Sequence, residues 1–145
     1  MRRAVVLVLL LVVAGCGGDD DGPLSQEDFE RQGNAICADL NRDLADLGQP
    51  QSPDEFVEQL ETGQDRLREA LRELEKLEPP EEHQRDFATL LRQGDEAVAT
   101  INELIAAGEA QDTEEFTEIA ARAEKQDAAS DDIARRIGLD ECATG

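Results

Sequence analysis

The chain has 145 residues, of which 35 are acidic and 14 are basic, and its formal net charge is −21. This length suits one domain, and the shortage of Lys and Arg excludes a nucleic-acid partner, whose phosphates must be neutralised by basic side chains. Trp and Tyr are absent and only four Phe are present, so the aromatic platforms on which bases stack are missing as well.

The N-terminus shows the order of features that is typical of an exported protein. A basic start at residues 1–3 is followed by an apolar run at residues 4–14. As a helix this run rises only about 16 Å, which is too short for a bilayer core of about 30 Å. We therefore predict a signal peptide over residues 1–15 rather than a membrane span.

The tetrapeptide VAGC, residues 13–16, resembles the lipobox of bacterial lipoproteins. This resemblance implies that the chain is cleaved between Gly15 and Cys16 and that the Cys16 sulfur carries a diacylglycerol group. Two or three acyl chains hold a protein on a bilayer far more durably than one, so we expect an anchor on the extracytoplasmic face of the cell membrane. Residues 16–24 would then form a flexible acidic tether. The alternative is an ordinary secreted protein with a chance cysteine.

The first half of residues 25–145 shows the periodicity of two helices. The first helix begins at Ser25 and ends at GQP, residues 48–50. The second opens with SPDE, residues 52–55, a capping box with proline at the first helical position, and PP at residues 79–80 breaks it. Their faces are spaced by three, four or seven residues: Phe29, Ile36, Leu40, Leu44 and Leu47, then Phe56, Leu60, Gly63, Leu67, Ala70, Leu74 and Leu77.

The second half shows the same periodicity twice more. The third helix runs through Phe87 and Ile105 and ends near Gly108, and the fourth begins at DTEE, residues 112–115. Gly138 is placed to cap the fourth helix. No segment alternates with the period of a strand, and the connections are short. We therefore expect an all-α fold, an antiparallel up-down four-helix bundle.

The two cysteines other than Cys16 form an even pair in a chain that is expected to be exported. Export permits a disulfide between Cys37 and Cys142. In an up-down bundle the end of the fourth helix lies near the start of the first, so we predict that Gly138 reverses the chain and that the tail folds back along the first helix. The alternative is a free catalytic or redox thiol, but no CxxC motif supports it.

Three glycines interrupt the middle of predicted helices, where each costs about 1 kcal/mol relative to alanine. Gly63 and Gly94 lie at similar distances on either side of the break at residues 79–80, so we expect them to meet at one height, with Gly33 and Ala123 in the same layer. Such a layer predicts either close helix packing or a narrow apolar cavity for a lipid tail or another small hydrophobic molecule.

Motifs that carry chemistry are absent from the sequence. A di-metal bundle needs Glu-x-x-His pairs, whereas the single histidine, His83, has Pro80 three residues before it. No phosphate-binding loop, nucleophile elbow or Cys/His metal spacing is present. We therefore expect no catalytic residues, no metal and no cofactor, and a non-catalytic interaction or structural role with an envelope protein as partner. A binding module for a small apolar ligand at the glycines is the second hypothesis, and an enzyme is the third.

The sequence also resembles small helical lipoproteins of high-GC Gram-positive bacteria. The similar segments are FERQGNAICADLNR at residues 29–42, LRELEKLEPPEEHQRDF at residues 71–87 and GLDEC at residues 138–142. The resemblance implies a helical architecture and a bridge between Cys37 and Cys142. It implies no activity.

Overall fold

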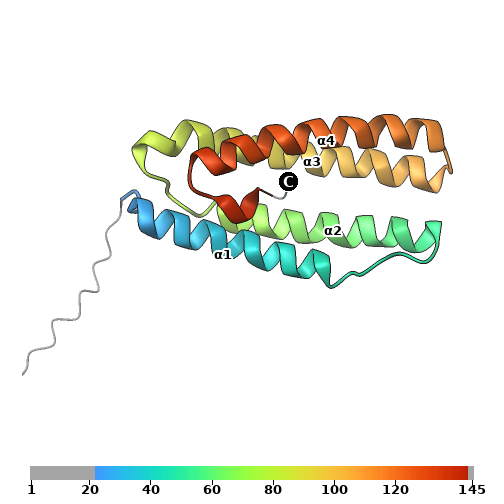
Figure 1. Ribbon diagram of the computed structural model, residues 1–145, viewed down its shortest axis with the longest axis horizontal. Helices are drawn as coiled ribbons and strands as arrows, with labels where there is room; N and C mark the ends of the chain where they lie inside the picture. Colours follow the sequence, from blue (N-terminus) through green and yellow to red (C-terminus); the bar gives the residue numbers. More distant parts are fainter. Residues whose placement is uncertain (1–21, 144–145) are drawn as a thin grey trace, which may run out of the picture.

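A computed structural model describes residues 22–143, which are all-helical and contain no strand (Figure 1). Four α-helices pack against one another: α1 (Gln26–Ala45), α2 (Pro53–Leu74), α3 (Gln84–Glu109) and α4 (Thr113–Arg136). Two short 3₁₀ helices, η1 (Glu81–His83) and η2 (Asp140–Cys142), precede α3 and follow α4. The all-helical prediction is confirmed. The predicted signal peptide, Cys16 and most of the tether lie outside the described residues.

The helices begin and end where their capping residues lie. The side chains of Ser25, Ser52 and Asp112 each accept a hydrogen bond of 3.0–3.1 Å from the backbone N–H three residues further on. Such bonds satisfy N–H groups that the first turn of a helix leaves without partners. Gly48 and Gly138 follow α1 and α4 with φ of +71° and +79°, a conformation that favours glycine over other residues.

The second helix is shorter than its apolar pattern predicts, because it ends at Leu74 rather than at the proline pair. Residues 75–80 form the connection to η1 instead. The backbone N–H of Leu24 donates a 2.8 Å hydrogen bond to the carbonyl of Glu78 in this connection. The chain that leads into α1 is therefore fastened to the turn between α2 and α3.

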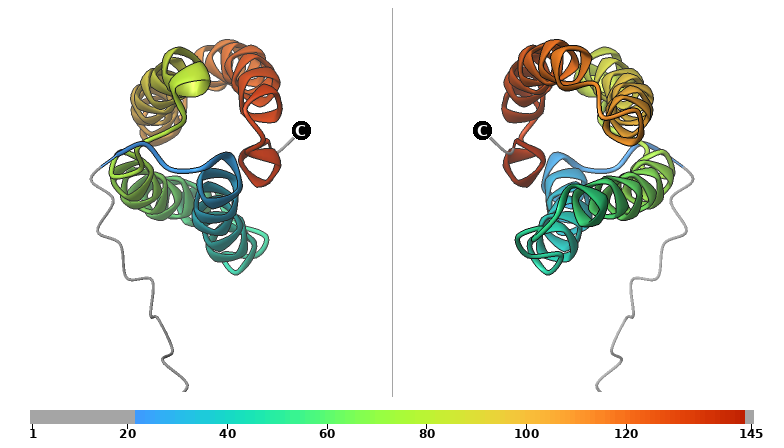
Figure 2. Two further views of the ribbon diagram at one scale, coloured as in Figure 1. Left: turned by 90° about the vertical axis from the view of Figure 1, so that its left-hand side faces the viewer. Right: turned by 90° about the vertical axis from the view of Figure 1, so that its right-hand side faces the viewer.

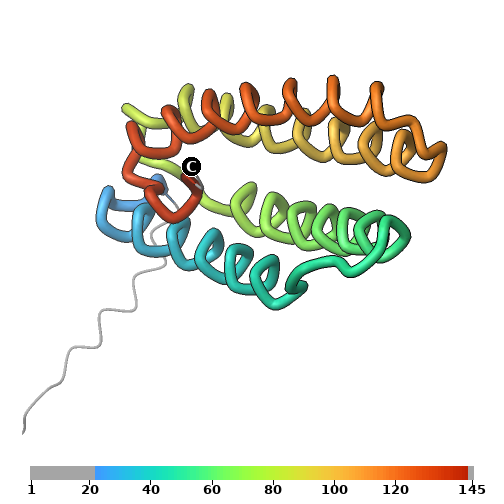
Figure 3. The backbone as a smooth tube through the Cα atoms, turned by 45° about the vertical axis from the view of Figure 1, so that its right-hand side comes forward, coloured from blue at the N-terminus to red at the C-terminus, as the bar shows by residue number. Residues whose placement is uncertain are grey.

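Neighbouring helices contact each other in opposite residue order (Figure 3). Between α3 and α4, Asp86 pairs with Arg136 and Glu103 pairs with Arg122, so later residues of α3 meet earlier residues of α4. Between α2 and α3, Gln64 bonds to Asn102 and Leu71 lies over Gly94, which gives the same opposite order. Between α1 and α2, Asp43 near the end of α1 pairs with Arg66. These pairings give the molecule two ends. The N-terminal end contains the start of α1 and the α2–α3 connection, and the far end contains residues 46–52 and 110–112.

The first and last helices do not pair along their backbones. Within residues 22–143, no Cα atom of α1 lies within 8 Å of a Cα atom of α4, whereas η2 lies close to both helices. Viewed along the helices, η2 lies between α1 and α4 (Figure 2). The C-terminal segment thus bridges two helices that would adjoin directly in a closed bundle.

Buried apolar residues form two clusters of different size. The larger cluster, at the N-terminal end, joins residues of all four helices and the tail: Phe29, Cys37, Leu74, Phe87, Leu90, Ile133, Ala134, Ile137 and Leu139. The smaller cluster, toward the far end, contains Leu104, Ala107 and Ile119. Phe29 and Phe87 meet edge to face in the larger cluster, with ring centroids 5.1 Å apart. Packing is therefore strongest at the N-terminal end.

The structure does not place the glycines of the predicted layer at one height. Gln64, beside Gly63, donates hydrogen bonds to the Val98 carbonyl and to Asn102, whereas Gly94 faces Leu71. Gly63 and Leu71 are eight residues apart on α2, which is about 12 Å along the helix, so Gly63 and Gly94 do not share a height.

Leucine side chains fill the space over Gly33 and Gly94, whereas Gly63 lines an apolar pocket of about 300 Å³. A Cβ atom at Gly33 would lie 2.5 Å from Leu139, and one at Gly94 would lie 2.3 Å from Leu71. At Gly63 a Cβ atom would lie 3.3 Å from Leu44 of α1. Each glycine thus admits a leucine from a different element. Ala123, the fourth residue of the predicted layer, is half-buried on α4.

Candidate functional site

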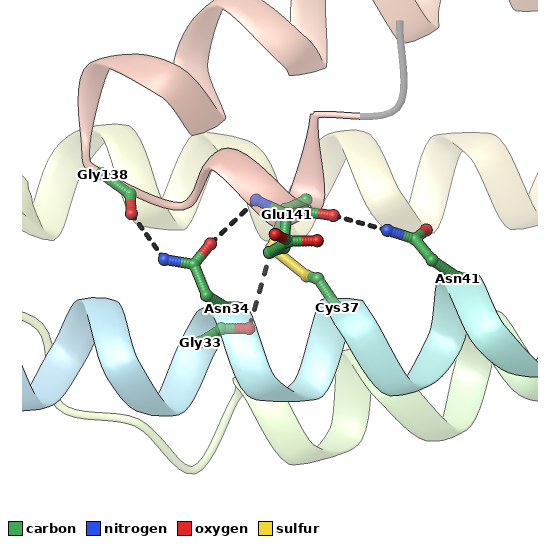
Figure 4. Close-up of a disulfide and its surroundings, with 7 residues drawn as sticks. Gly33, Asn34, Cys37, Asn41, Gly138 and Glu141 are labelled. Atoms are coloured by element: carbon green, nitrogen blue, oxygen red, sulfur yellow. Dashed lines mark hydrogen bonds between the residues drawn. A yellow bond between two sulfur atoms is a disulfide. The ribbon is translucent and has the colours of Figure 1, made fainter.

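The C-terminal tail is fastened to one face of α1 by a disulfide and by three hydrogen bonds of the Asn34 and Asn41 side chains (Figure 4). Cys37 and Cys142 are joined, with an S–S distance of 1.96 Å and a Cα–Cα distance of 5.0 Å. The predicted disulfide is therefore present, and the tail lies along α1 as expected. We call residues 138–142 with Asn34, Cys37 and Asn41 the tail clasp.

Two asparagines of α1 hold the backbone of the tail on either side of the disulfide. The Asn34 side chain donates to the Gly138 carbonyl and accepts from the Glu141 N–H, each at 2.8 Å. The Asn41 side chain donates to the Glu141 carbonyl, also at 2.8 Å. Sequence reasoning missed both residues. The spacing of Asn34, Cys37 and Asn41 by three and four residues places them on one helix face, and this signal could have identified them.

Leu139 fills the space between the tail and α1. Its side chain is completely buried and lies over Gly33, where a side chain on α1 would leave no room for it. The positive φ of Gly138 turns the chain so that Leu139 can enter the core. The tail clasp is therefore part of the hydrophobic core as well as a covalent bridge.

A second feature lies at the far end, where two apolar pockets meet at Phe56. One, of about 420 Å³, lies between the first turn of α2, the end of α3 and the first turn of α4, and its walls include Val57, Ala107 and Phe116. The other, of about 300 Å³, lies between α1, α2 and α3, and its walls include Leu44 and Ile101. We call the two pockets together the far hollow.

The two phenylalanines of the far hollow occupy equivalent places in their helices. Phe56 and Phe116 are each the fourth residue after an N-cap, Ser52 and Asp112 respectively. Both helices begin at the far end, so the two rings meet there, with centroids 5.7 Å apart. The repeated spacing from cap to phenylalanine is the sequence signal that could have placed these rings together.

The far hollow leaves apolar surface in contact with solvent. Leu44 is 38% exposed and Phe56 is 36% exposed, and these are the exposed large apolar side chains among residues 22–143. The apolar periodicity of α1 predicts that Leu44 is buried. No helix covers Leu44, because α4 does not lie beside α1. The tail clasp covers the gap only at the other end.

The charges around the far hollow have one sign. Residues 43–61 and 103–121 contain twelve Asp and Glu residues and no Lys, Arg or His. In the part of the chain that the structure describes, only Asp43 and Glu103 of these twelve form ion pairs, with Arg66 and Arg122. The far hollow is therefore an apolar depression in a strongly negative surface.

Polar chemistry elsewhere is sparse. Within residues 22–143, no group of three or more His, Cys, Asp or Glu side chains is placed to hold a metal ion. His83 lies in η1 with its ring 6.3 Å from the ring of Phe29. The pKa of Asp127 lies above its usual value, because its carboxylate is partly desolvated and lies near the charges of Asp131 and Glu124.

None of the helices at residues 22–143 is both long and apolar enough to cross a bilayer.

Comparisons of this chain with protein families, with curated proteins and with solved structures find no match.

Proposed function

We propose that this chain is a lipid-anchored module of a bacterial cell envelope that acts by contacting a partner rather than by catalysis. On this proposal the chain is cleaved before Cys16, and acyl chains on Cys16 hold it on the extracytoplasmic face of the membrane. Its folded part is an antiparallel up-down four-helix bundle, and the opposite order of contacts between neighbouring helices supports that topology.

The observation that carries the proposal is the disulfide between Cys37 and Cys142. Disulfides persist in oxidising compartments and are rare in the cytosol, so this bridge supports export. It also uses two of the three cysteines. The remaining cysteine is Cys16, which directly follows the apolar run and the small residues of the predicted signal.

The acidic surface supports a role at a distance from the bilayer. A net charge of −21 is repelled by anionic lipid headgroups, while acyl chains would keep the N-terminus in the membrane. The tether of residues 16–24 spans at most about 30 Å when extended. The bundle would then stand off the membrane and present its surface to other envelope components.

The experiment replaces Cys16 and follows where the protein fractionates. In a bacterial host the native chain should sediment with membranes, and Cys16→Ser should move it to the soluble or secreted fraction because the acceptor sulfur is lost. The double variant Cys37→Ser/Cys142→Ser is the matched control, and it should stay with the membranes. A native chain in the soluble fraction, or a Cys16→Ser variant that still sediments with membranes, would refute the anchor.

A further inference from the structure

We propose that the far hollow is the docking surface of this module and that its occupant is a basic amphipathic helix of a partner protein. Such a helix would place two neighbouring apolar side chains on either side of the Phe56 ring and surround them with Arg or Lys. This inference rests on the proposed function, because it assigns the surface through which the module contacts its partner. Three properties of the far end support it.

The first property is the shape of the far hollow. Two pockets of about 420 and 300 Å³ share Phe56, so an occupant needs two apolar groups that reach to opposite sides of one ring. Side chains spaced by three or four residues on a helix project side by side in this way. Helices that lay an apolar face into a hydrophobic groove are a recurrent mode of recognition.

The second property is the charge around the hollow. Asp54 and Glu61 are each within one helical turn of the pocket residue Val57, and Glu114 lies three residues before the pocket residue Thr117. None of these three carboxylates has a basic partner among residues 22–143. Basic side chains that flank the apolar face of a partner would meet complementary charge there.

The third property is that the same charge disfavours a second copy of this chain as the occupant. Two far ends brought face to face would place two sets of twelve carboxylates together, with two ion-paired Arg residues nearby on each copy. Like charges at an interface oppose association. Charge therefore selects a partner of opposite sign.

The test uses the purified full-length protein and a synthetic helical peptide of about four turns. The peptide has Leu at positions spaced by three and four residues along one side and Arg along the flanks. One control peptide has Gln in place of each Arg, and a second has the same composition with the Leu positions scattered. Binding is measured by titration calorimetry at about physiological salt, and amide chemical shifts locate the site.

Two kinds of variant separate the far hollow from general charge attraction. Phe56→Gln and Leu44→Gln each remove one apolar wall, and each should weaken binding about tenfold or more. Glu61→Gln/Glu114→Gln removes two charges at the far end and should weaken binding severalfold. The matched control, Glu81→Gln/Glu82→Gln, removes two exposed charges at the N-terminal end and should leave affinity unchanged within about twofold. Thermal melts check that each variant is folded.

The results that would overturn the proposal are distinct from one another. Equal weakening by the far-end and N-terminal-end charge variants would show general attraction to an acidic protein. Equal binding of the Gln peptide would show an apolar ligand without charge recognition, and dimerisation that Phe56→Gln abolishes would show a second copy. Failure of the anchor at Cys16 would leave these titrations unaffected, so the two proposals can fail separately.

Discussion

At the scale of single residues, Asp127 has surroundings that disfavour the charged form of its carboxylate. It lies on the exposed side of α4, but partial desolvation and the neighbouring Asp131 and Glu124 raise its pKa. Its charged form is therefore less stable in the folded chain than in the unfolded chain. This cost is present above the raised pKa and disappears as the pH falls below it, because Asp127 then takes up a proton.

We expect Asp127→Asn to raise the free energy of unfolding at neutral pH by about half a kcal/mol, a modest gain because solvent screens much of the repulsion. The gain should shrink as the pH falls through the raised pKa of Asp127. Urea denaturation at several pH values measures it. Asp132→Asn, which removes an equal charge from the exposed face of α4, controls for net charge. A gain that grows toward acid pH would contradict the assignment.

The sequence predicts the helix caps but not the hydrogen bonds of the tail clasp, and the reason is physical. The caps at Ser52 and Asp112 follow from local sequence, because a capping side chain bonds to a backbone only three residues away. The spacing of Asn34 from Cys37 indicates which helix face Asn34 lies on, but its partners, Gly138 and Glu141, lie more than a hundred residues along the chain. Only the folded path of the tail brings them together.

At the scale of elements, α1 is the helix with the least support. Its backbone approaches α2 and η2, but within residues 22–143 its Cα atoms stay more than 8 Å from those of α3 and α4. The Phe29 side chain at its start reaches α3, whereas Leu44 near its end is exposed. The tail clasp is thus the main link that holds α1 to the α4 side of the molecule.

We expect the double variant Cys37→Ser/Cys142→Ser to lose up to about 4–5 kcal/mol of stability, the chain-entropy value for a loop of this length. Hydrogen exchange should rise first in α1, because its link to α4 is lost, while the α3–α4 pair keeps its protection. Cys16→Ser, which leaves the bridge intact, should show native exchange in α1. Uniform acceleration across all four helices would contradict this assignment of the tail clasp.

Helical periodicity and capping predict where the helices lie in the sequence. They do not predict which parts of each apolar face are covered by other elements. The stripe from Phe29 to Leu47 predicts one buried face along the whole of α1. The structure buries Phe29, half-buries Ile36 and Leu40 and leaves Leu44 exposed, because the tail takes the position beside α1 that a fourth helix would occupy in a closed bundle. The common height predicted for Gly63 and Gly94 is not observed either. Equal numbers of residues on the two sides of a turn give equal heights only when the turn is symmetrical.

At the scale of the whole molecule, the two ends have different properties. The N-terminal end contains the larger core, the disulfide and the point where the chain enters α1 (Figure 1). The far end contains the smaller core, the far hollow and twelve carboxylates, of which only Asp43 and Glu103 form ion pairs among residues 22–143. Anchoring at Cys16 would place the far hollow at the opposite end of the molecule from the membrane attachment. This polarity fits a module that is fixed at one end and contacts a partner at the other.

The most direct test of the central claim is mass spectrometry of the mature protein isolated from its native membrane. The account predicts that the first residue is Cys16 and that its mass is increased by a diacylglycerol group or by that group and a further acyl chain. A mature chain that begins at Met1, or one that begins at an unmodified Cys16, would contradict the account.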